Sequence, residues 1–209
     1  MRALLLLCLL AVGCLAQKPY PCRSPPLLSG SVVVSTQTEA LWVSAKYIYD
    51  ALGQRMRVQE MGVFNNKTFS MDALLLYREG AMYVIDTEKR NCTKSPLKGD
   101  FHPMAIPKDA KLLGQAVLGS SSSPGEGLLV NTWIGKIPAA GKYMSTVTEF
   151  GCIPISTAYH TDQDGWIQTS FYNNVKGISD PGMLNPPDFC KGAELQSGQN
   201  PVDFFSLFL

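Results

Sequence analysis

Short segments of strand-forming residues, separated by turn residues, are the main pattern along this chain. These segments are rich in Val, Ile, Tyr, Phe and Trp, which favour the pleated, half-buried surface of a β-sheet. Strands are predicted at residues 31–35, 41–49, 54–60, 68–77, 81–86, 112–118, 128–135, 142–150, 155–160 and 166–172. About ten strands with turn signals every 8–12 residues predict an all-β sandwich or barrel.

The order of apolar and polar residues within these segments is of two kinds. Residues 54–60 alternate, with Met56 and Val58 on one face and polar side chains on the other, as in a half-buried strand. Residues 74–77 and 81–85 are apolar at every position. A strand that is apolar on both faces must hide both from water. Its second face needs a partner subunit or an apolar ligand, although such runs also occur in strands that the protein itself covers on both sides.

Helical signals are few. Pro107 can open a short helix over residues 107–110, and Asn200 can cap another over residues 201–209. We therefore expect one or two short helices beside the strands. The apolar end of the second segment is too short for the tail of a lipid-anchor signal, so we expect it to pack on the sheet.

The first 16 residues have the features of a secretory signal peptide. The basic start Met1-Arg2 precedes an apolar run, and Cys14 and Ala16 supply small residues before a cleavage site after Ala16. This run is shorter than the roughly 20 residues that span a bilayer. We therefore expect a signal peptide over residues 1–16, a single β domain over residues 17–209, a secreted protein and no transmembrane segment.

The charge balance argues against a nucleic-acid or anionic-membrane partner. The chain has 18 Lys and Arg residues against 17 Asp and Glu residues, and removal of Arg2 with the signal peptide makes the two numbers equal. A polyanion-binding protein normally carries a basic excess or a basic patch. Because the charges are also mixed along the sequence, we predict no nucleic-acid partner.

Four cysteines follow the predicted cleavage site, namely Cys22, Cys92, Cys152 and Cys190. An even number in a secreted chain predicts two disulfides, and the spacing allows three ways of pairing them. The wide spacing, without a C-x-x-C pair, does not fit a structural zinc site.

Two N-glycosylation sequons are present, Asn66-Lys67-Thr68 and Asn91-Cys92-Thr93. Asn66 lies in a polar turn and is expected to be exposed. Asn91 precedes a cysteine, whose disulfide would constrain it.

The motifs of common enzymes are absent from the sequence. It has two histidines, His102 and His160, and neither H-E-x-x-H nor G-x-S-x-G occurs. Residues 162–165 begin like a calcium loop, but Phe171 stands where that loop needs its last acid. We therefore predict a non-catalytic protein that needs no cofactor. A hydrolase with a nucleophile beside one of the histidines is the weakest alternative.

Several short motifs are similar to those of the ependymin family and follow in the same order. They are Pro21-Cys22 with Pro25-Pro26-Leu27, the stretch Tyr49-Asp50-Ala51-Leu52-Gly53-Gln54-Arg55-Met56-Arg57, Leu75-Leu76-Tyr77-Arg78-Glu79-Gly80, Asn91-Cys92-Thr93-Lys94, Phe101-His102-Pro103 with Ile106-Pro107-Lys108-Asp109-Ala110, Pro124-Gly125-Glu126-Gly127, and Gly151-Cys152-Ile153-Pro154. Each motif is short, but together they span nearly the whole mature chain. The chain therefore resembles an ependymin-related protein.

This resemblance implies properties that the residue pattern does not. It implies two stacked antiparallel sheets that form an open half-barrel, similar to bacterial lipoprotein carriers, with a deep apolar pocket between the sheets. It implies the disulfides Cys22–Cys152 and Cys92–Cys190. It also implies a glycosylated homodimer in extracellular fluid or the lysosome, which binds calcium and lipids such as gangliosides. The resemblance places the calcium ligands at no numbered position.

The leading hypothesis is a non-catalytic protein that binds gangliosides or fatty-acyl lipids in an apolar pocket. Burial would hold the acyl chain, at roughly 0.8 kcal/mol for each CH₂ group. The candidate lining residues are Trp42, Phe64, Phe69, Tyr83, Trp133 and Tyr143. The alternative hypothesis is an extracellular structural or adhesion glycoprotein whose apolar face serves dimerisation or matrix contact.

Overall fold

The structure is a computed structural model that describes residues 18–97, 99–137, 141–161 and 165–195. The predicted signal peptide and the predicted terminal helix at residues 201–209 lie outside these ranges. The turn at residues 162–164 also lies outside them.

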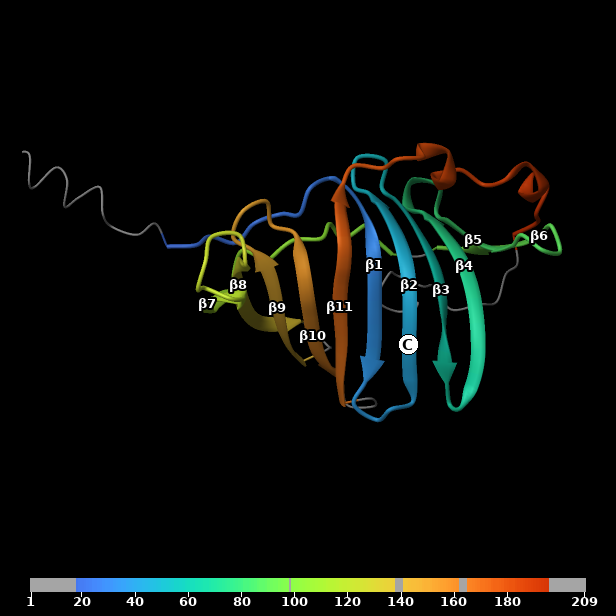
Figure 1. The fold of residues 1–209 in the computed structure, drawn as a ribbon. Helices are drawn as coiled ribbons and strands as arrows, with labels where there is room; N and C mark the ends of the chain where they lie inside the picture. Colours follow the sequence, from blue (N-terminus) through green and yellow to red (C-terminus); the bar gives the residue numbers. More distant parts are fainter. Residues whose placement is uncertain (1–17, 98, 138–140, 162–164, 196–209) are drawn as a thin grey trace, which may run out of the picture.

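All strands of the described residues belong to one antiparallel sheet (Figure 1). They are β1 (Leu27–Thr36), β2 (Leu41–Asp50), β3 (Arg55–Phe64), β4 (Lys67–Leu76), β5 (Ala81–Asp86), β6 (Asn91–Pro96), β7 (Lys111–Gly119), β8 (Gly127–Ile137), β9 (Gly141–Thr148), β10 (Pro154–Thr161) and β11 (Gly165–Lys176). Their order across the sheet is β6-β5-β4-β3-β2-β1-β11-β10-β9-β8-β7. The sheet therefore has two wings, β1 to β6 and β7 to β11, which meet where β1 pairs with β11.

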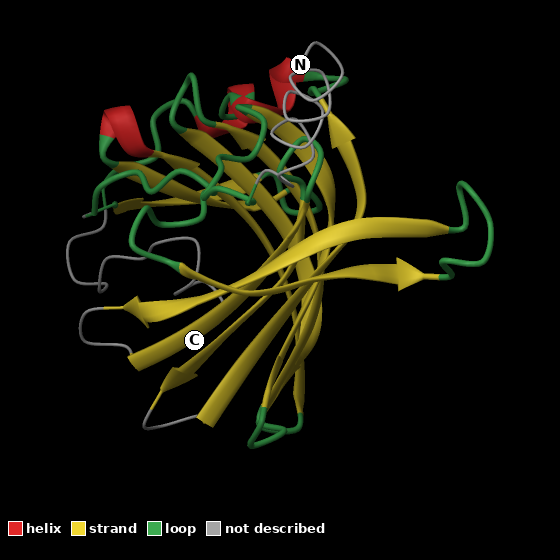
Figure 2. Cartoon of the chain, turned by 90° about the vertical axis from the view of Figure 1, so that its left-hand side faces the viewer, coloured by secondary structure: helices red, strands yellow, loops and turns green. Residues whose placement is uncertain are grey.

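The prediction of two stacked sheets is wrong, although the all-β class is correct. The strands β1 and β11 pair directly, from Leu28 opposite Lys176 to Thr36 opposite Ile167, with an irregularity between Ser29 and Ser31. This ladder joins the two wings into one sheet, which Figures 1 and 2 show to be curved.

Each predicted strand is present, with ends that differ by a few residues. The sequence pattern missed β6, because Asn91-Cys92-Thr93-Lys94-Ser95-Pro96 is mostly polar and ends in proline. The predicted helix at residues 107–110 is only a turn, in which Ala110 N donates to Pro107 O at 3.0 Å. The helical elements of the described residues are 3₁₀ turns: η1 (Tyr77–Glu79), η2 (Pro181–Leu184) and η3 (Asp188–Cys190).

The two faces of the sheet differ in burial. On β2 the side chains of Leu41, Val43, Ala45, Tyr47 and Tyr49 are buried on one face, which we call the inner face. The outer face carries Trp42 and Lys46, which are exposed. Because side chains alternate along a strand, the pairing register assigns the residues of each neighbouring strand to one of these two faces.

The connection from β6 to β7 covers one end of the inner face. We call residues 99–110 the crossing segment. Its Phe101 stacks on Tyr49 at a ring-centroid distance of 5.9 Å, and Met104 N donates to the Tyr49 hydroxyl at 3.0 Å. Ile106 N donates to Cys22 O at 2.8 Å, and Cys22 forms a disulfide with Cys152. The crossing segment is thus attached to both wings.

The segment that follows β11, described up to residue 195 and here called the C-terminal segment, covers the outer face of the first wing, β1 to β6. Leu184 and Cys190 are buried in one cluster with outer-face residues of β4 and β5, such as Leu74 and Tyr83. The disulfide Cys92–Cys190 attaches this segment to β6. Both disulfides implied by the family resemblance are therefore present.

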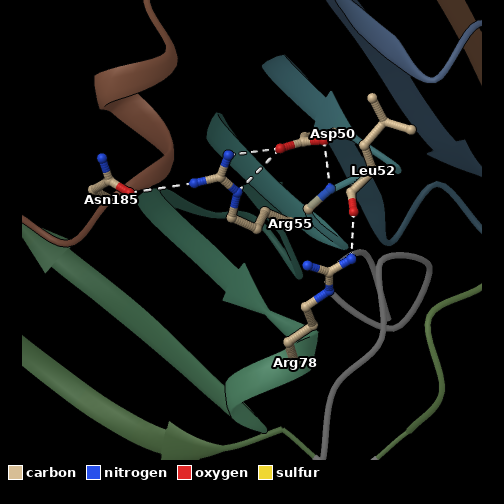
Figure 3. Close-up of polar contacts among 6 residues, drawn as sticks. Asp50, Leu52, Arg55, Arg78 and Asn185 are labelled. Carbon is tan, nitrogen blue, oxygen red and sulfur yellow. Dashed lines mark hydrogen bonds and ion pairs between the residues drawn. The ribbon is translucent and has the colours of Figure 1, made fainter.

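The turn between β2 and β3 is held by an ion pair (Figure 3). Asp50 accepts a hydrogen bond from Gly53 N at 2.7 Å and pairs with the Arg55 guanidinium at 2.7 Å. Burial favours the neutral acid, but these hydrogen bonds outweigh it and hold the pKa of Asp50 below its usual value. Arg55 also donates to Asn185 at 3.3 Å, and Arg78 donates to Leu52 O at 2.6 Å. The motif at residues 49–57 is therefore a structural one.

A second ion pair lies on the outer face between β3 and β4. Arg57 donates to both carboxylate oxygens of Asp72, at 2.8 Å and 2.7 Å. Gln59 donates to the same carboxylate at 3.0 Å. Arg57 also donates to Met183 O at 2.9 Å, which attaches η2 to the sheet. Because the Arg57 side chain is 9% exposed, its charge depends on Asp72 for compensation.

We expect Asp72→Asn to lower the free energy of unfolding by about 2–3 kcal/mol, because it leaves a buried guanidinium without its counter-charge. Equilibrium unfolding in urea measures this change. The control is Asp86→Asn, because Asp86 pairs with the exposed Lys89 and exposed pairs contribute little to stability. Equal effects of the two substitutions would contradict this assignment.

Candidate functional site

The inner face carries buried apolar side chains on both wings. We call its main buried group the inner cluster. Its members come from β1, β2, β3, β9, β10 and β11: Leu28, Val32, Val34, Leu41, Val43, Ala45, Tyr47, Tyr49, Met56, Val58, Tyr143, Tyr159, Ile167 and Phe171. Ala73, Leu75 and Met82 extend the apolar surface over β4 and β5. The side chains of the inner cluster are packed against one another, at 0–7% exposure.

Exposure of the inner face changes along β3. Met56 and Val58, near the crossing segment, are buried, and Glu60 is only 3% exposed. Phe64, at the far end of the strand, is 45% exposed. Phe69 of β4, which lies opposite Gly62, is partly buried against the inner cluster. The inner face is therefore closed at the crossing segment and accessible near Phe64.

Glu60 is a carboxyl group within this apolar surface. Its cross-strand neighbours are Ala45 on β2 and Met71 on β4. Neither carboxyl oxygen has a hydrogen-bond partner among the described residues. Burial disfavours the charged form and raises the pKa of Glu60 to about 7. The inner face therefore contains an acid that is neutral at acidic pH and charged at alkaline pH.

Two further buried polar groups without a partner in the described structure lie on the second wing, the indole N–H of Trp133 and the hydroxyl of Tyr143. Tyr143 lies opposite Gly135, where an added Cβ would approach its ring to 2.5 Å. A glycine at position 135 therefore lets this ring lie across β8. Burial and the nearby charge of Asp109 raise the pKa of Tyr143 above its ordinary value.

Other polar groups of the inner face are paired. The Tyr47 hydroxyl lies 2.5 Å from Asn174 Oδ1, and Asn174 Nδ2 donates to Pro154 O at 2.9 Å. Burial raises the pKa of Tyr47, so the group remains a neutral donor. This chain of bonds links β2 to β11 and β10, and it leaves Tyr47 no free group for a ligand.

The structure separates the six predicted lining residues. Phe64, Phe69, Trp133 and Tyr143 lie on the inner face according to the strand register. Trp42 lies on the outer face and is 52% exposed. Tyr83 packs with Leu74 and Leu184 on the outer face, beneath the C-terminal segment. The Lys94 ammonium lies 5.4 Å from its ring centre. The six residues therefore do not line one space.

The sequence reasoning missed Glu60, although its signal was present. Met56 and Val58 occupy the apolar positions of β3, and Glu60 follows them at the same spacing of two residues. A carboxyl group in the apolar register of a strand is the feature that could have been noticed.

The structure also locates the two glycosylation sequons and the two histidines. Asn66 is exposed in the turn between β3 and β4, and Asn91 is exposed at the start of β6; use of either sequon stays a prediction. His102 is exposed, and His160 packs edge-on against Trp166 at 5.4 Å.

Neither a metal site nor a membrane-spanning helix is found in the described part of the chain. No group of three His, Cys, Asp or Glu residues there is placed to hold a metal ion, so calcium binding stays a prediction. No helix within the described ranges has the length and apolar character to cross a membrane.

The fold and the inner face define an all-β protein with one curved, open antiparallel sheet. A crystal structure of an uncharacterised conserved protein from Thermus thermophilus has a similar fold, with a TM-score of 0.52, 10% sequence identity, and coverage of 83% of this chain and 90% of that one. At this identity the likeness concerns the fold alone.

Sequence comparison identifies the family. The ependymin family model matches residues 65–190. Ependymin-2 of Carassius auratus is 34% identical over 203 residues, which are 96% of this chain and 94% of that protein. Mammalian ependymin-related protein 1 of Mus musculus is 28% identical over 180 residues, which are 84% of this chain and 79% of that protein. The chain belongs to the ependymin family.

The unpaired carboxyl of Glu60 makes stability depend on pH. Because burial raises the pKa of Glu60 from 4.5 to about 7, the folded state binds a proton that the unfolded state releases between these values. The resulting cost to stability is absent below pH 4.5, grows up to pH 7, and is constant above it. We expect Glu60→Gln to raise the free energy of unfolding by about 1–3 kcal/mol at pH 8 and to change it little at pH 4.5.

Urea unfolding of both proteins at the two pH values measures this difference. An equal effect at both pH values would show that Glu60 does not change its pKa on folding.

Proposed function

We propose that this protein is a non-catalytic binder of apolar, lipid-like ligands, and that the ligand occupies the inner face of the sheet. The observation that carries the proposal is the apolar inner face, whose buried cluster takes side chains from both wings and which becomes exposed at Phe64. A hydrocarbon chain on this surface would be stabilised by burial, at roughly 0.8 kcal/mol for each CH₂ group.

Exposure of the inner-face side chains increases along β3 from Val58 to Phe64. This increase indicates how a bound ligand would be oriented. The crossing segment closes the inner face beside Tyr49, whereas Phe64 is 45% exposed at the opposite end. An amphiphile would therefore place its chain toward Val58 and its polar head near Phe64. Gangliosides and fatty-acyl lipids have this general shape.

An oxidising, extracellular location fits the two disulfides. Cys22–Cys152 joins residues 130 positions apart, and Cys92–Cys190 joins residues 98 positions apart. Disulfides of this kind persist in secreted proteins and are reduced in the cytosol. We therefore propose a secreted protein, with the lysosomal lumen as a further destination.

We expect Phe69→Asp to weaken binding of diphenylhexatriene, a fluorescent hydrocarbon, about tenfold or more, because loss of one buried phenyl contact costs roughly 1.5–3 kcal/mol. The matched control is Trp42→Asp, which places the same charge at an aromatic residue on the outer face. Fluorescence titration of the secreted protein measures both affinities, and mass spectrometry under native conditions tests for co-purified lipid. Equal losses in the two variants would place the hydrocarbon elsewhere, and no binding to the parent protein would refute the proposed function.

A second candidate function, extracellular association through an apolar face, is favoured by the hairpin of β7 and β8. Among the described residues, β7 has a strand partner on one side only. Leu118 and Leu128 lie opposite each other and are both exposed, as is Val117. An unpaired edge strand with apolar side chains is a template for pairing with another chain, and a second copy of this protein would offer the same edge. We propose a homodimer through β7.

We expect Leu118→Lys to convert this dimer to a monomer, because a lysine on an edge strand opposes strand pairing. Analytical ultracentrifugation measures the change, and the unfolding midpoint should stay that of the parent monomer. The control is Leu52→Lys, since Leu52 is also an exposed leucine but lies in the turn between β2 and β3. A dimer that survives Leu118→Lys would exclude this edge as the interface.

A further inference from the structure

The outer face is covered over β4 and β5 but exposed over β2, β1 and β11. The C-terminal segment packs on β4 and β5. The strands β2, β1 and β11 lie side by side in the sheet (Figure 1), and three aromatic side chains of their outer-face register are exposed. Trp42 is 52% exposed, Trp166 is 40% exposed and Tyr172 is 51% exposed. Large exposed apolar side chains that gather on one surface mark contact with another molecule.

The strand register fixes how the two tryptophans lie relative to each other. Ser35 of β1 pairs with Trp42 of β2 on one side and with Gln168 of β11 on the other. Trp166 precedes Gln168 by two residues and therefore lies on the same face. At about 4.8 Å between strands and about 3.3 Å for each residue along a strand, the Cα atoms of Trp42 and Trp166 lie on the order of 12 Å apart. A short chain of rings can contact both indoles at this separation.

The surface between the aromatic rings consists of hydroxyl and amide groups, and we call it the serine patch. Its serines are partly exposed on β1, β2, β10 and β11: Ser31, Ser35, Ser44, Ser156 and Ser170. Gln168 adds an amide group, and Tyr172, opposite Ser31, adds a phenolic hydroxyl. Hydroxyl and amide groups both donate and accept hydrogen bonds. The serine patch can therefore bond to a partner that is rich in hydroxyl groups.

The serine patch carries little charge. Strand β1 contains no charged residue, and β11 contains only Lys176, at its last position. In the outer-face register the titratable residue of β10 is His160, and β2 has the exposed Lys46. Asp50, at the end of β2, is already paired with Arg55. A polyanion is attracted by several cations and a polycation by several acids, so this surface fits an uncharged partner.

The residue types of the serine patch favour an oligosaccharide over a protein surface. Protein interfaces are enriched in Trp and Tyr but depleted in Ser, whereas this patch is rich in serine. In β-linked glucose and N-acetylglucosamine the ring substituents are equatorial, so the ring faces carry C–H groups and the rim carries hydroxyl groups. The C–H groups are partly positive and match the negative face of an indole ring. The hydroxyl groups of the rim match the serines and the glutamine.

Contacts within the protein already hold Trp166 in one position. His160 packs edge-on against its ring, with 5.4 Å between the ring centres. The backbone N–H of Trp166 donates to Gln37 Oε1 at 3.1 Å. A side chain that is already held loses less conformational entropy when a ligand binds. The exposed indole of Trp166 is therefore prepared for stacking.

We propose that the serine patch binds an uncharged, β-linked oligosaccharide, whose sugar rings stack on Trp42 and Trp166 while its hydroxyl groups bond to the serines and to Gln168. The patch lies on the opposite face of the sheet from the inner cluster, so this inference does not depend on the proposed function. A protein with this site attaches to neutral glycans outside the cell and keeps its inner face available for an apolar ligand.

The experiment titrates the full mature protein with the uncharged tetrasaccharides cellotetraose, chitotetraose and lacto-N-neotetraose, and isothermal calorimetry measures binding. We expect at least one of them to bind, with an affinity that is the same between about 50 and 300 mM NaCl, because no ion pair contributes. The variants W42A and W166A should each bind about tenfold more weakly, since each loses one stacking ring. The matched control is F150A, because Phe150 is 80% exposed but lies in the turn between β9 and β10; it should bind as the parent protein does.

Urea unfolding confirms that each variant is folded. Failure of all three tetrasaccharides to bind, or an equal loss of affinity in F150A, overturns the proposed site. Tighter binding of a sulfated heparin tetrasaccharide that is lost in K46A shows that the partner is an anion. Conversion of a dimer to a monomer by W42A or W166A, without oligosaccharide binding, assigns the patch to contact between copies of the chain. Binding of diphenylhexatriene is measured in parallel, so loss of the oligosaccharide site leaves the proposed function standing.

Discussion

The pairing of β1 with β11 is the interaction on which the architecture depends. Every other ladder of the described sheet joins strands that are consecutive in the sequence, whereas this one joins strands near opposite ends of the chain. Closing so long a loop costs chain entropy, and burial of Val32, Val34 and Ile167 offsets that cost. The disulfide Cys22–Cys152 fixes the same neighbourhood. Without this ladder the two wings would each present a separate apolar face, and the inner face would not exist.

The polar groups of that inner face fall into two kinds. Tyr47 and Tyr49 are bonded to other parts of the protein, so their hydroxyl groups hold strands and the crossing segment in place. Glu60, Trp133 and Tyr143 are equally buried but lack a partner in the described structure. Natural folds seldom keep such groups in an apolar surface unless they serve a site. The bonds of Tyr47 and Tyr49 are therefore structural, whereas the polar atoms of Glu60, Trp133 and Tyr143 take no part in holding the described elements together.

The strands could be predicted from the local sequence, because β-branched and aromatic residues separated by turn residues favour a pleated, half-buried backbone. The exception was β6, whose polar sequence resembles a loop and which becomes a strand through pairing with β5. The candidate site was predicted less well. Aromatic content alone does not report which face a residue occupies, so Trp42 and Tyr83 were grouped with Phe69 and Trp133. Glu60 continues the apolar register of Met56 and Val58, and the aromatic content on which the candidate site was based does not include it.

Alternation of side chains is a local property, and it was enough to establish an all-β protein with amphipathic and fully buried strands. The four cysteines and the family motifs added two covalent links, and both are present. The number of sheets and the joining of two apolar faces into one inner surface depended on which distant strands pair. Those outcomes follow from contacts between residues more than a hundred positions apart, and periodicity of two residues carries no information about them.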